Sequence, residues 1–225
     1  MRQWKKVQKC CIYQKNPTVT PDVLAAKPLN KADEWISVGY YYLDQDSPDK
    51  TIVWWFNGWQ ECENIFPTVL RDPSSSECDQ LVPSSGFFSN WLQDYQSLIE
   101  DNPQRNLLMV KNGLNFCQGV VARFPDMNCL LKNNFIESTA HLLLALGKSK
   151  QAIILLEQLI DQQPHTAHGY AVLAAVLSLD AQRYNLSPDI ERAKKLLLQA
   201  RQNTTDYEGW DVEFRLEDLQ EWQPG

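Results

Sequence analysis

The sequence has few of the features from which common catalytic sites are built. Only nine of its 225 residues are glycine, and they do not cluster, so there is no glycine-rich phosphate-binding loop. It also contains no G-x-S-x-G nucleophile elbow and no H-E-x-x-H zinc motif. An enzyme would need a site assembled from scattered polar residues, and no pattern indicates one. We therefore expect a protein that is not an enzyme.

Long apolar runs are also missing. The most apolar stretch, LLLALG at residues 142–147, is far shorter than the roughly 20 residues that cross a bilayer. No apolar segment of the kind found in signal peptides follows the basic N-terminus. None of the six cysteines forms a C-x-x-C pair. These features predict a cytoplasmic protein with free thiols and no membrane partner.

Charge is distributed unevenly along the chain. Residues 1–31 carry seven Lys and Arg against one acid, Asp22, so their net charge is +6; the whole chain is at −7, which leaves −13 for the rest. A basic segment can contact nucleic acid or an acidic partner, but six surplus charges are few, and nucleic acid is not the favoured partner. Three prolines in residues 14–30 indicate a linker. We expect a segment 1–30 followed by a helical domain 31–225.

From Lys31 onward the apolar residues recur with a helical period, and the alternation typical of strands never dominates. Prolines and glycines lie between the periodic segments, where helices begin or end, and Gly147 suits a helix C-terminus. The segment 67–86, with three prolines and five serines, is predicted to be a long loop. The expected helices span residues 31–44, 48–66, 87–101, 104–123, 128–146, 149–162, 166–179, 188–202 and 206–222.

Residues 35–42, WISVGYYY, contain a repeat-like pattern. Trp35, Val38 and Tyr42 fall on one face of a helix, where we expect them to face the core. Gly39 lies beside them and would let a second helix approach closely. That second helix would present small, large and small residues in turn: Thr51, Trp55 and Gly58.

The same small–large pattern returns twice downstream. One copy contains Ala140, Leu143, Gly147, Ala152, Leu156, Leu159 and Pro164, and the next contains Tyr170, Leu173, Ala174, Leu177, Ala193, Leu197 and Ala200. These copies resemble the tetratricopeptide repeat (TPR). The resemblance implies an all-α helical repeat array, an α-solenoid of about four helix pairs, with the acidic helix 206–222 as a solvating C-terminal cap. The alternative is a helical bundle with chance spacing.

The order of segments also resembles a narrower group, bacterial TPR-like proteins with a SEC-C zinc motif. The matching segments are residues 32–44, 55–59, 88–94 and 136–202, and KKVQKCC at residues 5–11 resembles the second half of the motif. Cys10 and Cys11 would supply two of the four zinc ligands, and Met1 stands where another ligand belongs. We therefore expect no cofactor, unless other residues, or residues upstream of a truncated start, complete a zinc site.

In TPR proteins the first helix of each pair lines a concave groove that binds the partner. The groove residues that this resemblance implies are Ile36, Tyr40, Asn134, Glu137, His141 and His168. Because they include no cluster of Lys or Arg, a neutral or basic peptide suits the groove. His165 and His168 could hold a metal at i, i+3, but a surface pair is the simpler interpretation.

The sequence thus predicts a protein–protein interaction module that binds a peptide or protein in a helical groove. A different possibility is a zinc- or nucleic-acid-binding adaptor that uses the basic, cysteine-containing N-terminus. The oligomeric state stays open.

Overall fold

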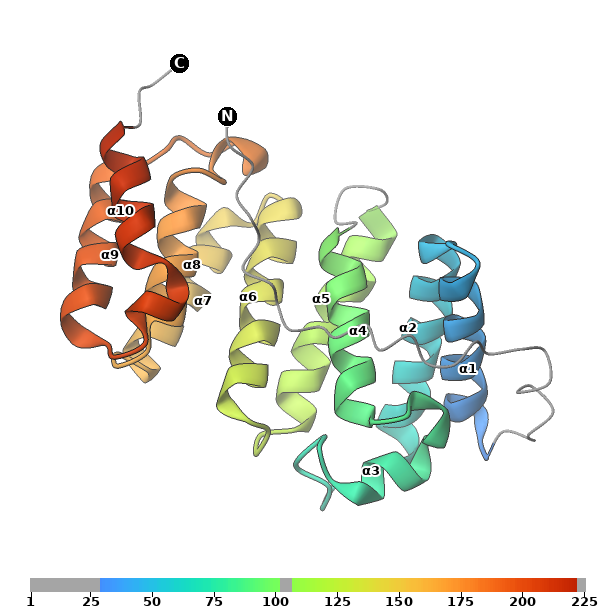
Figure 1. Cartoon of the computed structure of the whole chain (residues 1–225). Coiled ribbons are helices and arrows are strands. Elements are labelled where there is room, and N and C mark those ends of the chain that lie inside the picture. The colour runs from blue at the N-terminus through green and yellow to red at the C-terminus, as the bar shows by residue number, and fades with distance from the viewer. Residues whose placement is uncertain (1–28, 102–106, 222–225) are drawn as a thin grey trace. The chain divides into compact units, whose positions relative to one another are not determined.

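The computed structural model describes residues 29–101 and 107–221, which form helices and no strand (Figure 1). No helix in these two ranges is long and apolar enough to cross a membrane. The helices are α1 (Lys31–Asp44), α2 (Pro48–Ile65), α3 (Ser76–Leu81), α4 (Phe88–Asp101), α5 (Leu107–Arg123), α6 (Cys129–Ala145), α7 (Ser149–Gln162), α8 (Ala167–Leu177), α9 (Ile190–Asn203) and α10 (Val212–Glu221), with 3₁₀ turns η2 (Pro83–Ser85), η3 (Gln182–Tyr184) and η4 (Tyr207–Trp210).

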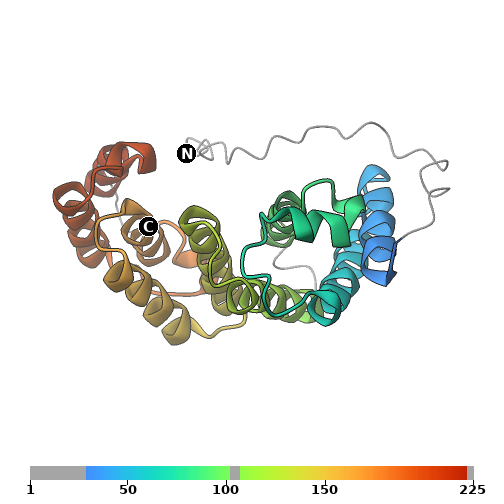
Figure 2. The ribbon, with the colours of Figure 1, turned by 90° about the horizontal axis from the view of Figure 1, so that it is seen from below.

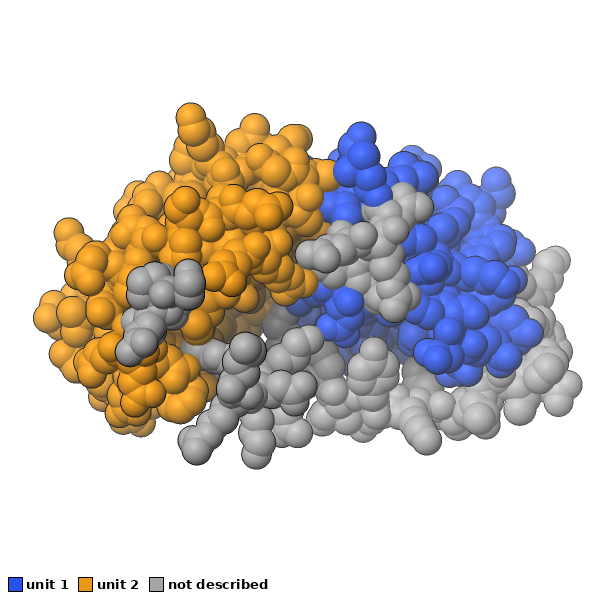
Figure 3. All heavy atoms as spheres, turned by 90° about the horizontal axis from the view of Figure 1, so that it is seen from above, with its two compact units in different colours: residues 1–127 blue, residues 128–225 orange. Residues whose placement is uncertain are grey.

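The chain divides into two compact units, residues 1–127 and 128–225 (Figure 3). The first unit holds α1 to α5 and the second holds α6 to α10. The all-α class expected from the sequence is confirmed for the described residues. The repeat-like pattern of the sequence predicts one array over residues 31–225 and does not indicate this division.

Helices α1 and α2 lie side by side (Figures 1 and 2). They approach each other closely at Gly39, as the sequence predicts. A Cβ on Gly39 would lie only 2.1 Å from Cδ1 of Trp55. The indole Nε1 of Trp55 donates a hydrogen bond to the carbonyl oxygen of Ile36 at 3.1 Å. In α2, Gly58 faces the side chain of Ile36 across the contact between the two helices, which we call the seam. A Cβ on Gly58 would lie 3.0 Å from Ile36 Cγ1. The seam therefore depends on a glycine in each helix.

The face that α1 buries differs from the expected one. Ile36 and Gly39 are buried, whereas Trp35, Val38 and Tyr42 are only partly buried. At a crossing this narrow, an isoleucine opposite a glycine fits, and a tryptophan in the same place would push the helices apart. Trp35, Val38 and Tyr42 are consequently turned out of the contact between α1 and α2.

Aromatic side chains fill the core of the first unit. Tyr95 of α4 packs 4.3 Å from the ring centre of Phe116 of α5, and Trp59 of α2 lies 5.4 Å from the same ring. The hydroxyl of Tyr95 donates to the carbonyl oxygen of Ile52 at 3.1 Å, which satisfies its polar end inside the core. These contacts join α2, α4 and α5.

The segment 67–86 is not a simple loop, because it contains α3 and η2. Ser75 caps α3 by accepting from the backbone N–H of Cys78. The segment is held against the start of α1, where Asp33 accepts from Ser84 N at 2.7 Å and the Asn30 amide donates to the carbonyl oxygen of Leu81 at 2.6 Å. Polar anchors of this kind leave no periodic pattern in the sequence, which explains why the expectation of a loop was wrong.

Arg123, at the end of α5, binds the segment that follows α2. Its guanidinium donates to the carbonyl oxygens of Phe66 (3.0 Å), Pro67 (2.6 Å) and Leu70 (2.6 Å). Changing Arg123 to alanine leaves these oxygens without that donor, and we expect the free energy of unfolding to fall by about 1–3 kcal/mol. Urea denaturation, monitored by circular dichroism, measures this fall in the free energy of unfolding. Arg123→Lys, which lacks the planar fork, should recover only part of the loss; full recovery by lysine would contradict the hydrogen-bonding role.

The second unit is built from the pairs α6–α7 and α8–α9, with α10 packed on α9 (Figure 2). The small and large residues expected at its seams are buried: Ala140, Leu143, Ala152, Leu156, Leu159, Tyr170, Leu173, Ala174, Leu177, Ala193, Leu197 and Ala200. Gly147 ends α6 with φ 72°, where its N–H bonds Leu144 O and the next N–H, of Lys148, bonds Leu143 O. This is the Schellman arrangement that a glycine favours.

Candidate functional site

The residues expected to line a groove fall in both units. Ile36 and Tyr40 lie on α1 in the first unit, whereas Asn134, Glu137 and His141 on α6 and His168 on α8 lie in the second. Ile36 is fully buried against Gly58 and lines no open surface, which corrects its assignment to the groove. Asn134 is partly exposed on α6.

Tyr40 ties α1 to α4. Its hydroxyl donates to Asp94 Oδ2 at 3.3 Å, and its ring lies 5.0 Å from that of Trp55. Burial raises the pKa of Asp94 to about 6, and the hydrogen bond from Tyr40 lowers it only in part. Burial, and then the neighbouring carboxylate, raises the pKa of Tyr40 above its usual range. Tyr40 therefore packs and bonds within its own unit, although it stays partly exposed.

The raised pKa of Asp94 predicts a stability that changes with pH. Because the folded state holds this proton up to about pH 6 and the unfolded chain releases it near 3.8, stability falls as pH rises through that interval. Asp94→Asn removes the charge. With allowance for solvent screening, it should be more stable than the parent by about 1–2 kcal/mol at pH 8 and no more stable at pH 4.

Urea denaturation at the two pH values checks this expectation. Glu217→Gln, exposed within α10, is the control and should leave stability nearly unchanged at both pH values. A difference between Asp94→Asn and the parent that is equal at pH 4 and pH 8 would contradict the role of burial.

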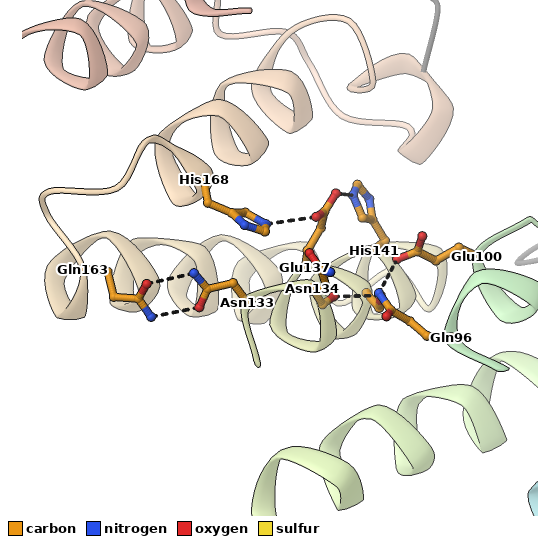
Figure 4. A network of polar contacts seen from close by, with 9 residues as sticks. Gln96, Glu100, Asn133, Asn134, Glu137, His141, Gln163 and His168 are labelled. Atoms are coloured by element: carbon orange, nitrogen blue, oxygen red, sulfur yellow. Dashed lines mark hydrogen bonds and ion pairs between the residues drawn. The ribbon is translucent and has the colours of Figure 1, made fainter. Parts of the chain in front are cut away.

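In the second unit, α6 and α8 bring together Glu137, His141 and His168 (Figure 4). The Glu137 Oε2 atom lies 3.0 Å from His168 Nε2, and its Oε1 atom lies 3.7 Å from His141 Nε2. His141 Nδ1 is in turn 2.9 Å from the hydroxyl of Tyr184 in η3. We call these four residues, together with Trp210 of η4, the Glu137 cluster.

His168 is the buried member of the Glu137 cluster. Its ring lies 4.2 Å from that of Trp210, and its side chain is 2% exposed. Since Nε2 faces a carboxylate, this nitrogen carries the ring hydrogen and donates a hydrogen bond to Glu137. The Nδ1 atom is buried without a hydrogen-bond partner. His168 thus fixes the position of the Glu137 carboxylate.

This burial corrects the expectation that His165 and His168 form a surface pair. His165 is exposed, and its Nδ1 atom lies 3.4 Å from the carbonyl oxygen of Asn203. His168 points instead to Glu137, 31 residues earlier in the chain. Within the described ranges, no group of three or more His, Cys, Asp or Glu residues could hold a metal ion.

Three residues at or beside the Glu137 cluster were not found from the sequence. Tyr184 lies in the extra residues between α8 and α9. These residues depart from the repeat pattern, and that departure was the sequence signal that could have pointed to Tyr184. Trp210 and Arg215 belong to the C-terminal turn and helix, and Arg215 Nε donates to the carbonyl oxygen of Trp210 at 2.9 Å. Burial lowers the pKa of Arg215, and nearby acids, among them Asp211 and Glu137, oppose this shift.

The cysteines of the described residues do not resemble zinc ligands. Burial raises the pKa of both Cys62 and Cys78, which favours thiol over the thiolate that binds metal. Cys129 is exposed, and its sulfur lies 3.1 Å from Gln163 Oε1. Cys10 and Cys11, the expected half of a zinc motif, lie outside the described residues.

No protein-family model, no curated protein and no solved structure matches this chain. A fold by itself does not define a function, so the function has to be inferred from the surfaces and polar groups. The Glu137 cluster offers a carboxylate, two imidazoles and a phenol. The side chains of His141 and Glu137 remain 22% and 17% exposed, so this edge of the cluster can exchange hydrogen bonds with a bound polypeptide.

Proposed function

We propose that this protein is a cytoplasmic, TPR-like interaction module, not an enzyme, that binds a neutral or basic protein segment and uses no cofactor. The binding surface is the part of the second unit formed by α6 and α8, the first helices of its two pairs. The observation that supports this most directly is the Glu137 cluster, in which partly exposed Glu137 and His141 are held by buried His168.

The Glu137 cluster is pre-organised for binding. The Glu137 carboxylate is oriented by His168, which is packed against Trp210, and the His141 ring is oriented by the hydroxyl of Tyr184. Because these side chains are already held in place, little rotamer entropy is lost when a partner docks. A carboxylate on the surface and no grouping of Lys or Arg among the expected groove residues favour a partner that is not acidic.

The repeat character rests on the seams of the helix pairs. Alanines at positions 140, 152, 193 and 200 are buried where the helices of the second unit meet. Gly39 has the same role in the first unit. In this proposal α10 is the polar end of the array; it carries exposed acids at Glu213, Glu217 and Glu221, beside one exposed aromatic side chain, Phe214.

The test compares matched variants in quantitative affinity purification from the source cells, followed by calorimetry with the purified partner. The binding variant is His141→Ala combined with Tyr184→Phe, and the control is Lys150→Ala, exposed on α7. We expect the control to bind like the parent and the binding variant to bind about tenfold more weakly, a loss of about 1.4 kcal/mol. Equal affinity of all three proteins, with unchanged circular dichroism, would contradict the proposal.

The net charge of +6 on residues 1–31 favours a second candidate, an adaptor that binds zinc or nucleic acid through its N-terminus. That function requires binding that weakens steeply with salt and disappears when residues 1–15 are removed. Under the interaction-module proposal, removal of these residues leaves affinity for the partner unchanged. The same calorimetric titration, repeated at two salt concentrations, separates the two candidates.

A further inference from the structure

Leu130, in the first turn of α6, is a large apolar side chain on the same helix as Glu137 and His141. It is 60% exposed. Residues spaced by four, three and four positions along a helix point in nearly the same direction. Leu130, Asn134, Glu137 and His141 have this spacing and form one row along α6, which we call the α6 row. Figure 4 shows its last three members.

The chemistry of the α6 row changes along the helix. A single exposed leucine is common on protein surfaces, and only its place in the row gives it meaning. Leu130 offers apolar surface, the partly exposed Asn134 offers a carboxamide, and Glu137 offers a carboxylate. Glu137 Oε2 lies 3.0 Å from His168 Nε2, but a carboxylate accepts up to about four hydrogen bonds. The row can therefore contact an apolar and a basic side chain at the same time.

We propose, on the basis of the function proposed above, that Leu130 is a further specificity-determining residue of the α6–α8 surface. The partner is an extended segment that carries an apolar residue and a Lys or Arg three positions apart. The apolar side chain covers Leu130, and the cation of the basic side chain meets the carboxylate of Glu137. This charge complementarity fixes where the segment sits along α6.

The spacing of the two residues on α6 determines the spacing on the partner. Leu130 and Glu137 are seven positions apart, which corresponds to about 10.5 Å along the helix axis. A polyproline II segment rises by about 3.1 Å per residue with three residues per turn, so side chains three positions apart share one face and lie about 9 Å apart. In a β-strand, side chains two positions apart share a face but lie only about 7 Å apart.

An α-helix on the partner would also match the distance, with side chains seven positions apart. Short helices are marginally stable in water, so a peptide that binds as a helix must first meet the cost of forming one. The polyproline II conformation is already common in unfolded chains, and it leaves backbone N–H and C=O groups free. The carboxamide of Asn134, which lies between Leu130 and Glu137 in the row, can donate to and accept from such groups.

Selection of peptides from a phage library of random dodecapeptides tests the proposal without a known partner. The immobilised full-length chain is used as the parent, as Leu130→Ser, as Glu137→Gln and as the control Ile154→Ser. The native side chain of Ile154, on α7, is similarly exposed at 52%. Glu137→Gln removes the charge but keeps an oxygen that can accept from His168. Circular dichroism verifies that every variant is folded.

We expect the parent and Ile154→Ser to enrich peptides with an apolar residue and a Lys or Arg three positions apart. Leu130→Ser should keep the preference for the basic residue and lose the preference for the apolar one. Glu137→Gln should do the reverse. In calorimetry, a synthetic peptide from the parent selection should bind Leu130→Ser about tenfold more weakly than the parent, and Ile154→Ser like the parent.

The other outcomes separate this inference from the proposed function. Enrichment of basic peptides that depends on Glu137, with an apolar preference that is absent or unchanged in Leu130→Ser, would overturn the inference and leave the proposed function in place. A spacing of two or of seven positions would overturn the extended partner in the same way. Enrichment of no peptide, or of peptides that neither substitution affects, would contradict the proposed function and this inference together.

Discussion

Trp55→Ala is expected to lower the free energy of unfolding by about 3–5 kcal/mol, the largest loss that we predict for a single substitution. The Trp55 side chain is fully buried. Its ring contacts those of Tyr40, Trp91 and Tyr95, and its Nε1 bonds the carbonyl oxygen of Ile36. Alanine would remove this hydrogen bond and leave a cavity where α1, α2 and α4 meet.

Urea denaturation monitored by circular dichroism measures the loss. The neighbouring Trp54 offers a matched control, because it is the same residue type on the same helix but only partly buried. Trp54→Ala should cost clearly less than Trp55→Ala. If the two variants lose equal stability, the assignment of Trp55 to the centre of the first unit is wrong.

Gly39→Leu is expected to cost about 3 kcal/mol, at the upper end of the usual range for overpacking. Even the Cβ of the new side chain would lie 2.1 Å from the indole of Trp55, so the indole or the whole of α1 must move. The control is Gly209→Ala, where a Cβ meets no atom within 4 Å, and it should leave stability nearly unchanged.

A double-mutant cycle separates overpacking from a change in helix propensity. If the clash with Trp55 causes the loss, Gly39→Leu should cost less in a Trp55→Ala background, because the cavity accepts the new side chain. Additive losses would show that Gly39 and Trp55 do not act on each other. Unchanged stability of Gly39→Leu in the parent would contradict the close crossing of α1 and α2 altogether.

Local signals placed the helices of this chain accurately where caps and spacing agree. Helix α7 spans residues 149–162, as expected, because Gly147 ends the preceding helix. The signals failed for α3, which is short and depends on Asn30 and Asp33 far away in the sequence. They also failed for the orientation of α1, because spacing alone does not show whether Trp35 or Ile36 fits opposite Gly58.

The candidate site was foreseeable only in part. The sequence placed Glu137 and His141 on one face of α6, and the structure brings them together with His168. The burial of His168 depends on Trp210, which lies beyond the repeat pattern, and the orientation of His141 depends on Tyr184, which lies in an irregular turn. Contacts between residues so distant in sequence arise only after the helices have packed.

The central claim, that α6 and α8 form the binding surface, is tested most directly by hydrogen–deuterium exchange of the full chain with and without its purified partner. We expect the partner to slow exchange in residues 129–145 and 167–177, and to leave α7 and α9, the second helices of the two pairs, unchanged. Slower exchange confined to α7 and α9, or to residues 1–28, would contradict the claim.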